Sequence, residues 1–226
     1  MAGSSVPVGV DTAAQVQRAA EAIIARRDHV VPQQGVLVAI SGIDGSGKGY
    51  LAGRIVERLG QRSVRAVSLS VDGWLNLPAR RFRAEAPAPH FYEHAIRFEE
   101  MFADLVLPLK MHRSVHLVAD FTEETAREYR KHTYHFEDVD VIVLEGIFLL
   151  KREYCRLYDL TVWIECSFET ARERALTRGQ EGLSPAETVR AYETIYFPAQ
   201  RIHFARDQPQ AAADIVLLND GRLTGR

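Results

Sequence analysis

A glycine-rich turn between an apolar run and a helical pattern is the feature that most constrains this chain. Residues 36–40 are continuously apolar, and Gly42, Gly47 and Lys48 follow with the spacing Gly-x-x-x-x-Gly-Lys. Apolar residues at helical spacing continue over residues 49–59. In a strand, glycine turn and helix of this kind, backbone N–H groups converge on one point at the helix N-terminus. The segment therefore predicts a P-loop, which binds a polyphosphate.

We expect this loop to bind ATP, although the sequence does not decide between ATP and GTP as the nucleotide. Glycines let the backbone approach the phosphates, and Lys48 supplies a positive charge for the β- and γ-phosphates. The residues expected to contact the nucleotide are Gly42, Ile43, Asp44, Gly45, Ser46, Gly47, Lys48, Gly49 and Tyr50.

One position departs from the P-loop pattern. The residue after Lys48 is normally Ser or Thr, whose hydroxyl binds Mg²⁺, but here it is Gly49. Two interpretations stay open. Asp72 and Glu145 could hold Mg²⁺ through water, since this ion commonly keeps several waters and needs one or two carboxylates. Alternatively, metal binding and turnover are impaired.

Further apolar runs alternate with helical patterns along the chain. The runs cover residues 64–70, 115–119, 139–144, 160–164 and 215–218, and the helical patterns cover residues 98–107, 168–178 and 185–204. This alternation predicts an α/β fold, a P-loop three-layer sandwich with a largely parallel five-stranded sheet and a small lid. Residues 1–226 are expected to form a single domain, in which residues 1–34 contribute an N-terminal helix over residues 13–27. Residues 73–90 and the lid, residues 177–184, are expected to be functional loops.

Two acids follow predicted strands. Asp72 comes after residues 64–70, and Glu145 comes after residues 139–144. Both are expected at the carboxyl edge of the sheet, where ligands of such folds bind. Asp72 is the candidate catalytic base for an attacking hydroxyl, and Asp72 and Glu145 are the candidate metal ligands. A turn residue and a helix cap are the simpler interpretations of the two acids.

Three arginines lie on the helical pattern that leads into the lid. Arg172, Arg174 and Arg178 are candidate catalytic residues, because lid arginines can stabilise charge on phosphates in the transition state. A solvated helix face is the equally weighted alternative for each of them.

The overall charge argues against two classes of partner. The formal net charge is −2 and the chain has no basic block, which predicts no nucleic-acid partner and no membrane surface as partner. No apolar run approaches the ~20 residues of a membrane span, and the start of the chain lacks a signal-peptide pattern, so we expect a cytoplasmic protein. The sequence leaves a homo-oligomer open.

Taken in order, these segments resemble the uridine kinase and phosphoribulokinase-like family of P-loop kinases over residues 36–218. The resemblance rests on the P-loop, the Asp72-Gly73-Trp74 segment, the Leu144-Glu145-Gly146-Ile147 strand end, the lid arginines, and Tyr192, Pro198 and Ala213-Asp214-Ile215. Residues 92–99 are similar to a family segment whose first acid contacts the substrate ribose, which would be Glu93 here. The resemblance implies an ATP- and Mg²⁺-dependent kinase of a small molecule, with substrate contacts from Tyr92, Glu93, His94, Arg97 and Phe121.

Departures from the family pattern fall where a nucleobase would be recognised. The family's Tyr, His and Gln at these places correspond to Ala119, Glu124 and Ala191, whereas Phe121 remains and could stack on a ring. A site that has lost such polar groups should accept a different substrate.

Three functions therefore remain in competition. The first is a uridine kinase-like enzyme with Asp72 as base. The second is a kinase of a non-nucleoside alcohol such as a sugar phosphate, pantothenate or glycerate, for which the nearby arginines Arg80, Arg81, Arg83 and Arg97 would suit an anionic acceptor. The third, suggested by Gly49, is a nucleotide-binding regulatory protein with little turnover.

Overall fold

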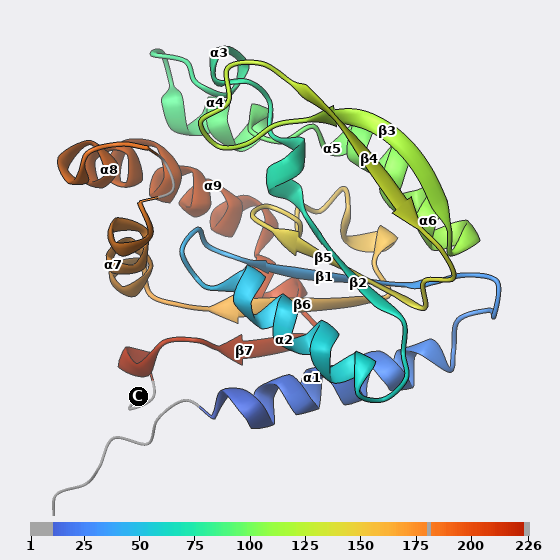
Figure 1. Cartoon of the computed structure of the whole chain (residues 1–226). Helices are drawn as coiled ribbons and strands as arrows, with labels where there is room; N and C mark the ends of the chain where they lie inside the picture. The colour runs from blue at the N-terminus through green and yellow to red at the C-terminus, as the bar shows by residue number, and fades with distance from the viewer. Residues whose placement is uncertain (1–10, 180–181, 224–226) are drawn as a thin grey trace, which may run out of the picture.

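A five-stranded parallel sheet forms the centre of the molecule (Figure 1). The computed structural model describes residues 11–179 and 182–223, so residues 180 and 181 of the expected lid loop lie outside the described part. The strand order is β2-β5-β1-β6-β7, and every neighbouring pair is parallel. The strands are β1 (Val36–Gly42), β2 (Ala66–Ser70), β5 (Val141–Gly146), β6 (Leu160–Glu165) and β7 (Ile215–Leu218). The predicted α/β sandwich with a parallel five-stranded sheet is confirmed.

The central strand β1 is buried on both faces, as its unbroken apolar sequence predicts. Val38 and Ile40 pack into the core shared with α1 (Thr12–Arg27) and α2 (Lys48–Gly60). Leu37 and Ala39, on the alternate positions, pack into the core beneath the helices of the opposite face. The period of two along a strand therefore produces the three layers.

The predicted N-terminal helix is present as α1. The Asp11 side chain caps it by accepting a hydrogen bond from the Ala14 N–H at 2.9 Å. Its buried positions, Val16, Ala19 and Ile23, follow helical spacing, and α1 packs against α2 and β7. No helix of the described residues is both long and apolar enough to cross a membrane.

The opposite face carries helices from two stretches of chain. The first comprises α4 (Pro87–His94), α5 (Phe98–Met101) and α6 (Leu107–His112). The second comprises α7 (Phe168–Arg178), α8 (Pro185–Ala191), α9 (Phe197–Asp207) and the short α10 (Pro209–Ala212). Two wide π-helical turns, Phe102–Val106 and Tyr192–Tyr196, each end two residues before a proline, Pro108 or Pro198. A proline lacks the N–H and crowds the preceding turn, which accounts for the widening there.

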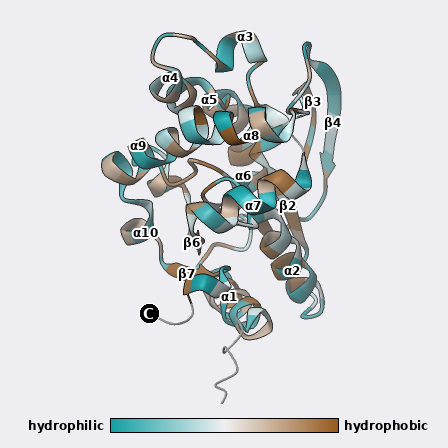
Figure 2. Ribbon diagram, turned by 90° about the vertical axis from the view of Figure 1, so that its left-hand side faces the viewer, coloured by the Kyte–Doolittle hydropathy of each residue, from teal (hydrophilic) through white to brown (hydrophobic). Residues whose placement is uncertain are grey.

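Residues 115–119 were expected to belong to the main sheet, and this prediction is wrong. They lie in β3 (Val115–Phe121), which pairs antiparallel with β4 (Arg130–Phe136) as a separate two-stranded ribbon. Burial alternates along β3, as in a strand with one covered face, and β4 is largely hydrophilic (Figure 2). The ribbon packs against the 3-10 helix that follows β2, the π-helical turn Phe102–Val106 and α6 (Figure 1).

Residues 73–90 were expected to be a long loop, and the structure corrects this too. The chain turns through a 3-10 helix, Val71–Trp74, and then forms α3 (Pro78–Arg81) and the start of α4. The helices α3 and α4 each have proline in the first turn, where its missing N–H costs no hydrogen bond. Prolines that suggested a loop instead mark helix starts.

Candidate active site

The glycine loop connects β1 to α2 in a conformation that only glycine adopts easily. Gly45 has φ 75° and Gly47 has φ 88°. A Cβ at Gly45 would lie 2.5 Å from the Ala171 carbonyl oxygen, and one at Gly47 would lie 2.4 Å from the Asn219 amide nitrogen. The two glycines therefore allow both the turn and its close contact with α7 and the segment after β7.

Two side chains outside the loop fix its backbone. Arg174 donates to the Ser46 carbonyl at 3.2 Å and to the Asn219 carbonyl at 2.8 Å. The Asn219 amide donates to the same Ser46 carbonyl at 2.8 Å. Arg174, predicted as a catalytic charge stabiliser, therefore holds the loop backbone through hydrogen bonds in this structure.

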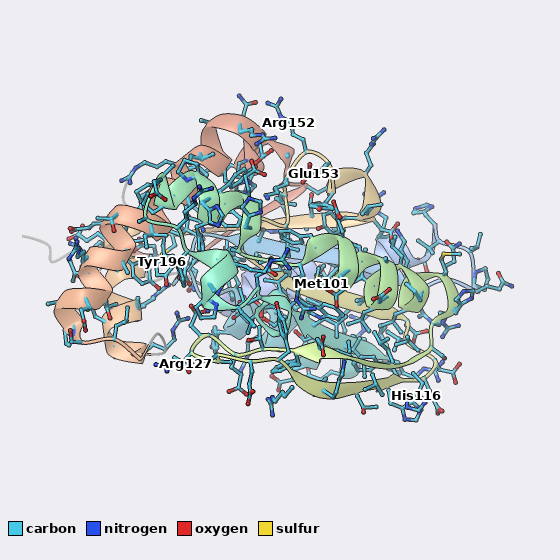
Figure 3. All side chains as sticks on the ribbon, turned by 90° about the horizontal axis from the view of Figure 1, so that it is seen from above. Met101, His116, Arg127, Arg152, Glu153 and Tyr196 are labelled. Atoms are coloured by element: carbon cyan, nitrogen blue, oxygen red, sulfur yellow. The ribbon has the colours of Figure 1, made fainter. Side chains whose placement is uncertain are left out.

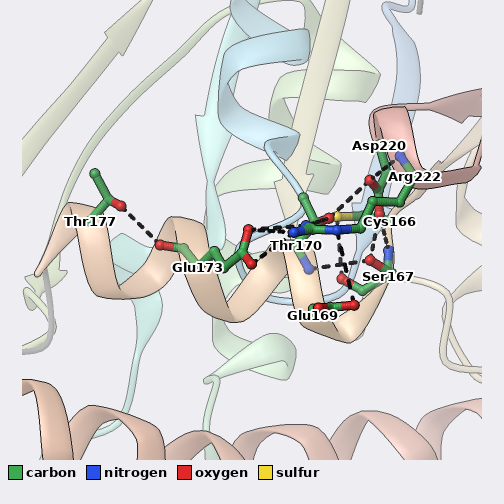
Figure 4. A network of polar contacts seen from close by, with 8 residues as sticks. All are labelled: Cys166, Ser167, Glu169, Thr170, Glu173, Thr177, Asp220 and Arg222. Carbon is green, nitrogen blue, oxygen red and sulfur yellow. Dashed lines mark hydrogen bonds and ion pairs between the residues drawn. The ribbon is translucent and has the colours of Figure 1, made fainter. Parts of the chain in front are cut away.

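A polar network anchors the helix that carries Arg174 (Figure 4). Ser167 caps α7, and Asp220 accepts hydrogen bonds from the Ser167 backbone N–H and from the Thr170 hydroxyl, each at 2.9 Å. Arg222 pairs with Glu173 on the next turn at 2.8 Å. Burial acts against ionisation of Asp220, but these donated hydrogen bonds outweigh it and hold its pKa at about 2. The anchor remains charged at neutral pH, which keeps α7 against the loop.

A cavity of about 370 Å³ opens in front of the glycine loop. Lys48, Asp72 and Glu145, which come from three different segments, line it together. Lys48 is 8% exposed, and its ammonium donates to the Ile43 carbonyl at 3.0 Å, so that the side chain folds back over the loop. Other lining residues are Asp44, Gly45, Gly47, Gly49, Tyr50, Leu75, Phe91, Glu124, Ile147, Arg178 and Tyr196.

The two acids of this cavity share one electrostatic environment. Burial by the surrounding protein raises the pKa of Asp72, and Lys48 opposes the shift. Burial likewise raises the pKa of Glu145, again against Lys48, and Asp72 adds to the rise. Two partly desolvated carboxyl groups that line one cavity are suited to a cation beside them.

The position of Gly49 bears directly on metal binding. A Cβ built on Gly49 would lie 3.8 Å from the Glu145 carboxyl carbon and from both of its oxygens. The space normally filled by the Ser or Thr side chain therefore faces Glu145. Asp72, Glu145 and nucleotide phosphates together offer the oxygen donors that Mg²⁺ prefers, so these residues fit the ion. Among the described residues no group of three or more His, Cys, Asp or Glu side chains gathers as a metal site by itself.

The other two predicted lid arginines, Arg178 and Arg172, point in different directions. Arg178 lines the phosphate cavity and lies 3.6 Å from an Asp44 carboxyl oxygen. Asp44 also accepts a hydrogen bond from the Tyr192 hydroxyl at 2.8 Å. Arg172 turns away from the cavity and pairs with Glu193 at 3.1 Å. Of the three arginines, Arg178 alone lines this cavity.

A second cavity, of about 340 Å³, adjoins the first beneath the β3–β4 ribbon. Asp72 and Glu124 line both cavities. Phe121, a predicted substrate contact, lies in the second cavity, where its ring packs over Gly73. The ribbon that the sequence did not predict therefore provides one wall of the site.

The remaining predicted substrate contacts do not line either cavity. The Tyr92 side chain is buried and donates to Asp207. Glu93 pairs with Arg206 at 2.6 Å. With His94 and Arg97, Glu93 lines a separate cavity that also contains Glu153. Figure 3 shows Glu153 on the opposite side of the molecule from the ribbon residue His116.

Sequence reasoning missed one ion pair beside the site. Arg81 is 1% exposed, and it donates to a Glu124 carboxyl oxygen at 3.0 Å and to the Glu124 carbonyl. Burial raises the pKa of Glu124, while Arg81 opposes the shift. Glu124 was singled out only as a departure from a family pattern, and Arg81 only as one of several arginines.

Comparison with known proteins identifies the class to which this geometry belongs. The model of the phosphoribulokinase / uridine kinase family matches residues 37–182. This span includes the glycine loop, Asp72, Glu145 and the anchored helix α7. The chain belongs to the phosphoribulokinase / uridine kinase family of P-loop kinases.

Similar proteins include two uridine kinases. That of Limosilactobacillus reuteri (strain DSM 20016) is 29% identical over 133 residues, which is 58% of this chain and 58% of the relative. The chain thus aligns with little more than half the length of that relative. The uridine kinase of Geobacillus sp. (strain WCH70) is 28% identical over 202 residues, covering 82% of this chain and 87% of the relative.

Solved structures share the fold at lower identity. A "possible uridine kinase" from Bacillus stearothermophilus has a TM-score of 0.72 at 19% identity, covering 92% of this chain and 100% of its own. A D-glycerate 3-kinase from Cryptococcus neoformans var. grubii has a TM-score of 0.64 at 12% identity, covering 92% and 96%. These structures support the fold and say nothing about the substrate.

Proposed function

We propose that the protein transfers the γ-phosphoryl group of ATP to a hydroxyl group of a small molecule. The observation that carries this proposal is the position of Asp72, which lines both the cavity at the glycine loop and the neighbouring cavity. A nucleotide in the first cavity and an alcohol in the second would meet at this carboxylate. Phosphoryl transfer needs such an in-line meeting of nucleophile and γ-phosphorus.

The surrounding residues supply the remaining requirements. Asp72 accepts the proton of the attacking hydroxyl, and its raised pKa improves it as a base relative to an exposed aspartate. Lys48 and Arg178 stabilise the charge on the transferred group, and the loop N–H groups hold the other phosphates. Mg²⁺, when bound, would be held by Glu145 and Asp72 and would neutralise charge on the β- and γ-phosphates.

A panel of acceptors tests the proposal. We expect acceptor-dependent release of ADP from ATP and Mg²⁺, measured against uridine, cytidine, free sugars and phosphorylated or carboxylated alcohols. Uridine is the first acceptor to test because the similar proteins above are uridine kinases. ATP binding without stimulation by any acceptor would contradict phosphoryl transfer and favour a nucleotide-binding regulatory protein, the alternative that Gly49 suggests.

The substitution Gly49→Ser separates these two functions. The space beside Glu145 accepts the side chain, so we expect a folded protein whose Mg²⁺ requirement falls by a few fold, because the hydroxyl adds one oxygen ligand. For a working kinase, kcat should change by less than about tenfold, since water can fill the same coordination position. Titration of ADP release with Mg²⁺ measures both quantities.

Gly53→Ser is the matched control, because Gly53 lies on the same helix and a Cβ there would meet nothing within 4 Å. This control should leave the Mg²⁺ requirement unchanged. An increase of activity from near zero in Gly49→Ser would instead identify the native chain as a regulatory protein with suppressed turnover.

A further inference from the structure

The charges lining the second cavity all have one sign. Asp72, Glu123 and Glu124 contribute carboxylates, and among the described residues no lysine or arginine lines this cavity. The carboxylates of Glu123 and Glu124 line this cavity and their arginine partners do not, so a phosphate or carboxylate on an acceptor would approach the acidic side of each ion pair as well as Asp72. Like charges a few ångströms apart in a partly buried site repel strongly.

The arginines close to this cavity are already engaged. Arg81 is held by Glu124. Arg97 pairs with Glu100 at 2.6 Å and donates to the Asp120 carbonyl at 2.6 Å. Its guanidinium also lies over the Trp74 ring at 5.1 Å. Arg81 and Arg97, two of the four arginines that suggested an anionic acceptor, therefore contact protein groups, and none of the four lines the cavity.

Arg130, on the ribbon, is also paired with a protein carboxylate. It pairs with Glu123 at 2.5 Å and lies over the Phe121 ring at 4.7 Å. Both Arg130 and Glu123 are more than 60% exposed at their side chains, so this pair belongs to the outer surface. The Glu124 carboxylate, at 24% exposure, faces the enclosed part.

An aromatic wall completes the cavity. The Trp74 and Tyr134 rings stack with their centroids 5.9 Å apart. The His132 ring centroid lies 4.5 Å from that of Tyr134 and 5.0 Å from that of Phe121. All four rings line the cavity. An aromatic wall beside carboxylates suits a ligand with one apolar face and several hydroxyl hydrogens.

Glu124 is placed to accept hydrogen bonds from such hydroxyls. One of its oxygens accepts from Arg81, and among the described residues no other side chain is bonded to its carboxylate. An ionised carboxylate only accepts hydrogen bonds, so a ligand group that displaces water from its free oxygen must be a donor. A hydroxyl supplies one, whereas a phosphate or carboxylate oxygen does not.

We propose that the second cavity receives an uncharged, hydroxyl-rich acceptor and that Glu124 is the residue that excludes anionic ones. The inference rests on the proposed phosphoryl transfer and narrows its substrate class. Phosphorylated alcohols and hydroxy acids are excluded as acceptors. Glu124 contacts the acceptor and takes no part in transferring the phosphoryl group.

Matched pairs of acceptors test the charge rule, by which the cavity accepts uncharged acceptors and excludes anionic ones. D-ribose with ribose 5-phosphate, fructose with fructose 6-phosphate, and glycerol with glycerate differ mainly in charge. We expect kcat/KM to favour the uncharged member by at least about tenfold wherever either member is phosphorylated, since repulsion of ~1.4 kcal/mol already gives that factor. A preference for the charged members would overturn the proposal.

Glu124→Gln tests the residue. Glutamine preserves the shape and can still accept from Arg81, but it removes one negative charge and leaves Arg81 without its counter-ion. We expect the preference for uncharged members to fall below about threefold, through better KM for the charged member, with kcat retained. Asp120→Asn, which removes an exposed acid of the same ribbon that does not line the cavity, is the control and should keep the native preference. Equal effects of the two substitutions would contradict a specific role for Glu124.

Failure of the proposed function can be told apart from failure of this inference. Binding of each acceptor is measured separately by the shift in Tm in the presence of a non-hydrolysable ATP analogue. Absence of ADP release together with selective binding of the uncharged members would reject the kinase and keep the charge rule. Binding of the charged members by the native protein would reject the charge rule.

Discussion

Asp72→Asn is expected to lower kcat for acceptor-dependent ADP release by about 10²- to 10⁴-fold, the usual contribution of a general base. Asparagine has the same shape, but it cannot take the proton of the attacking hydroxyl. Asp72 lines both cavities, so its loss affects the transfer step and leaves the glycine loop and Lys48 in place. We expect the affinity for ATP, measured by calorimetry, to change by less than about threefold in comparison.

The control for this substitution is Asp120→Asn. Asp120 lies on the ribbon, 40% exposed, and pairs with Lys131 at 2.6 Å on the surface. Its replacement should leave kcat and ATP binding unchanged. Retention of more than a tenth of the native kcat in Asp72→Asn would contradict a base. Recovery of the rate at high Mg²⁺ would show that the loss comes from weaker metal binding and not from the missing base.

The sheet and the loop could be predicted because their sequence signals are local. The apolar run that becomes β1 has one stable environment, a strand covered on both faces, and glycines at positions 45 and 47 match the backbone with positive φ. Asp72 and Glu145 follow the neighbouring strands β2 and β5, so parallel topology brings both to one edge. Strand order was enough to place them together, while their chemical roles stay predictions.

The ribbon could not be predicted because β4 lacks an apolar pattern. It begins with Arg130, Lys131 and His132, and only the middle of the strand is buried. Its stability comes from pairing with β3 and from contacts such as Tyr134 on Trp74, which join residues far apart in the sequence. An apolar pattern predicts which face of a strand is buried, but it does not predict which strand will pair with it.

Tyr92 and Glu93, predicted as substrate contacts, do not line the two cavities, because a one-residue step on a helix turns the side chain by about 100°. On α4, Phe91 faces the phosphate cavity, whereas the next residue, Tyr92, points into the core and Glu93 reaches Arg206. The same geometry separates the arginines of α7. Arg174 and Arg178, four residues apart, both face the glycine loop, and Arg172 does not.

Lys48→Met is the second substitution with a large expected effect. Lys48 lowers the pKa of both Asp72 and Glu145 and is the candidate ligand of the β- and γ-phosphates. Methionine fills a similar volume without charge, so the loop should keep its fold. We expect kcat/KM for ATP to fall by about 10²- to 10³-fold, the usual cost of removing one group that stabilises transition-state charge. Initial rates of ADP release over a range of ATP concentrations measure it.

A second buried lysine provides the control for that experiment. Lys151 is 4% exposed and donates to the Tyr92 carbonyl at 2.8 Å, much as Lys48 donates to the Ile43 carbonyl. Unlike Lys48, it lines neither the cavity at the glycine loop nor the second cavity. Lys151→Met should lower the free energy of unfolding by about 1–3 kcal/mol, because it leaves a buried carbonyl without its donor. It should leave kcat/KM for ATP nearly native. If both variants lost the same stability and the same activity, the effect of Lys48 would be one of folding, and its proposed contact with the phosphates would be wrong.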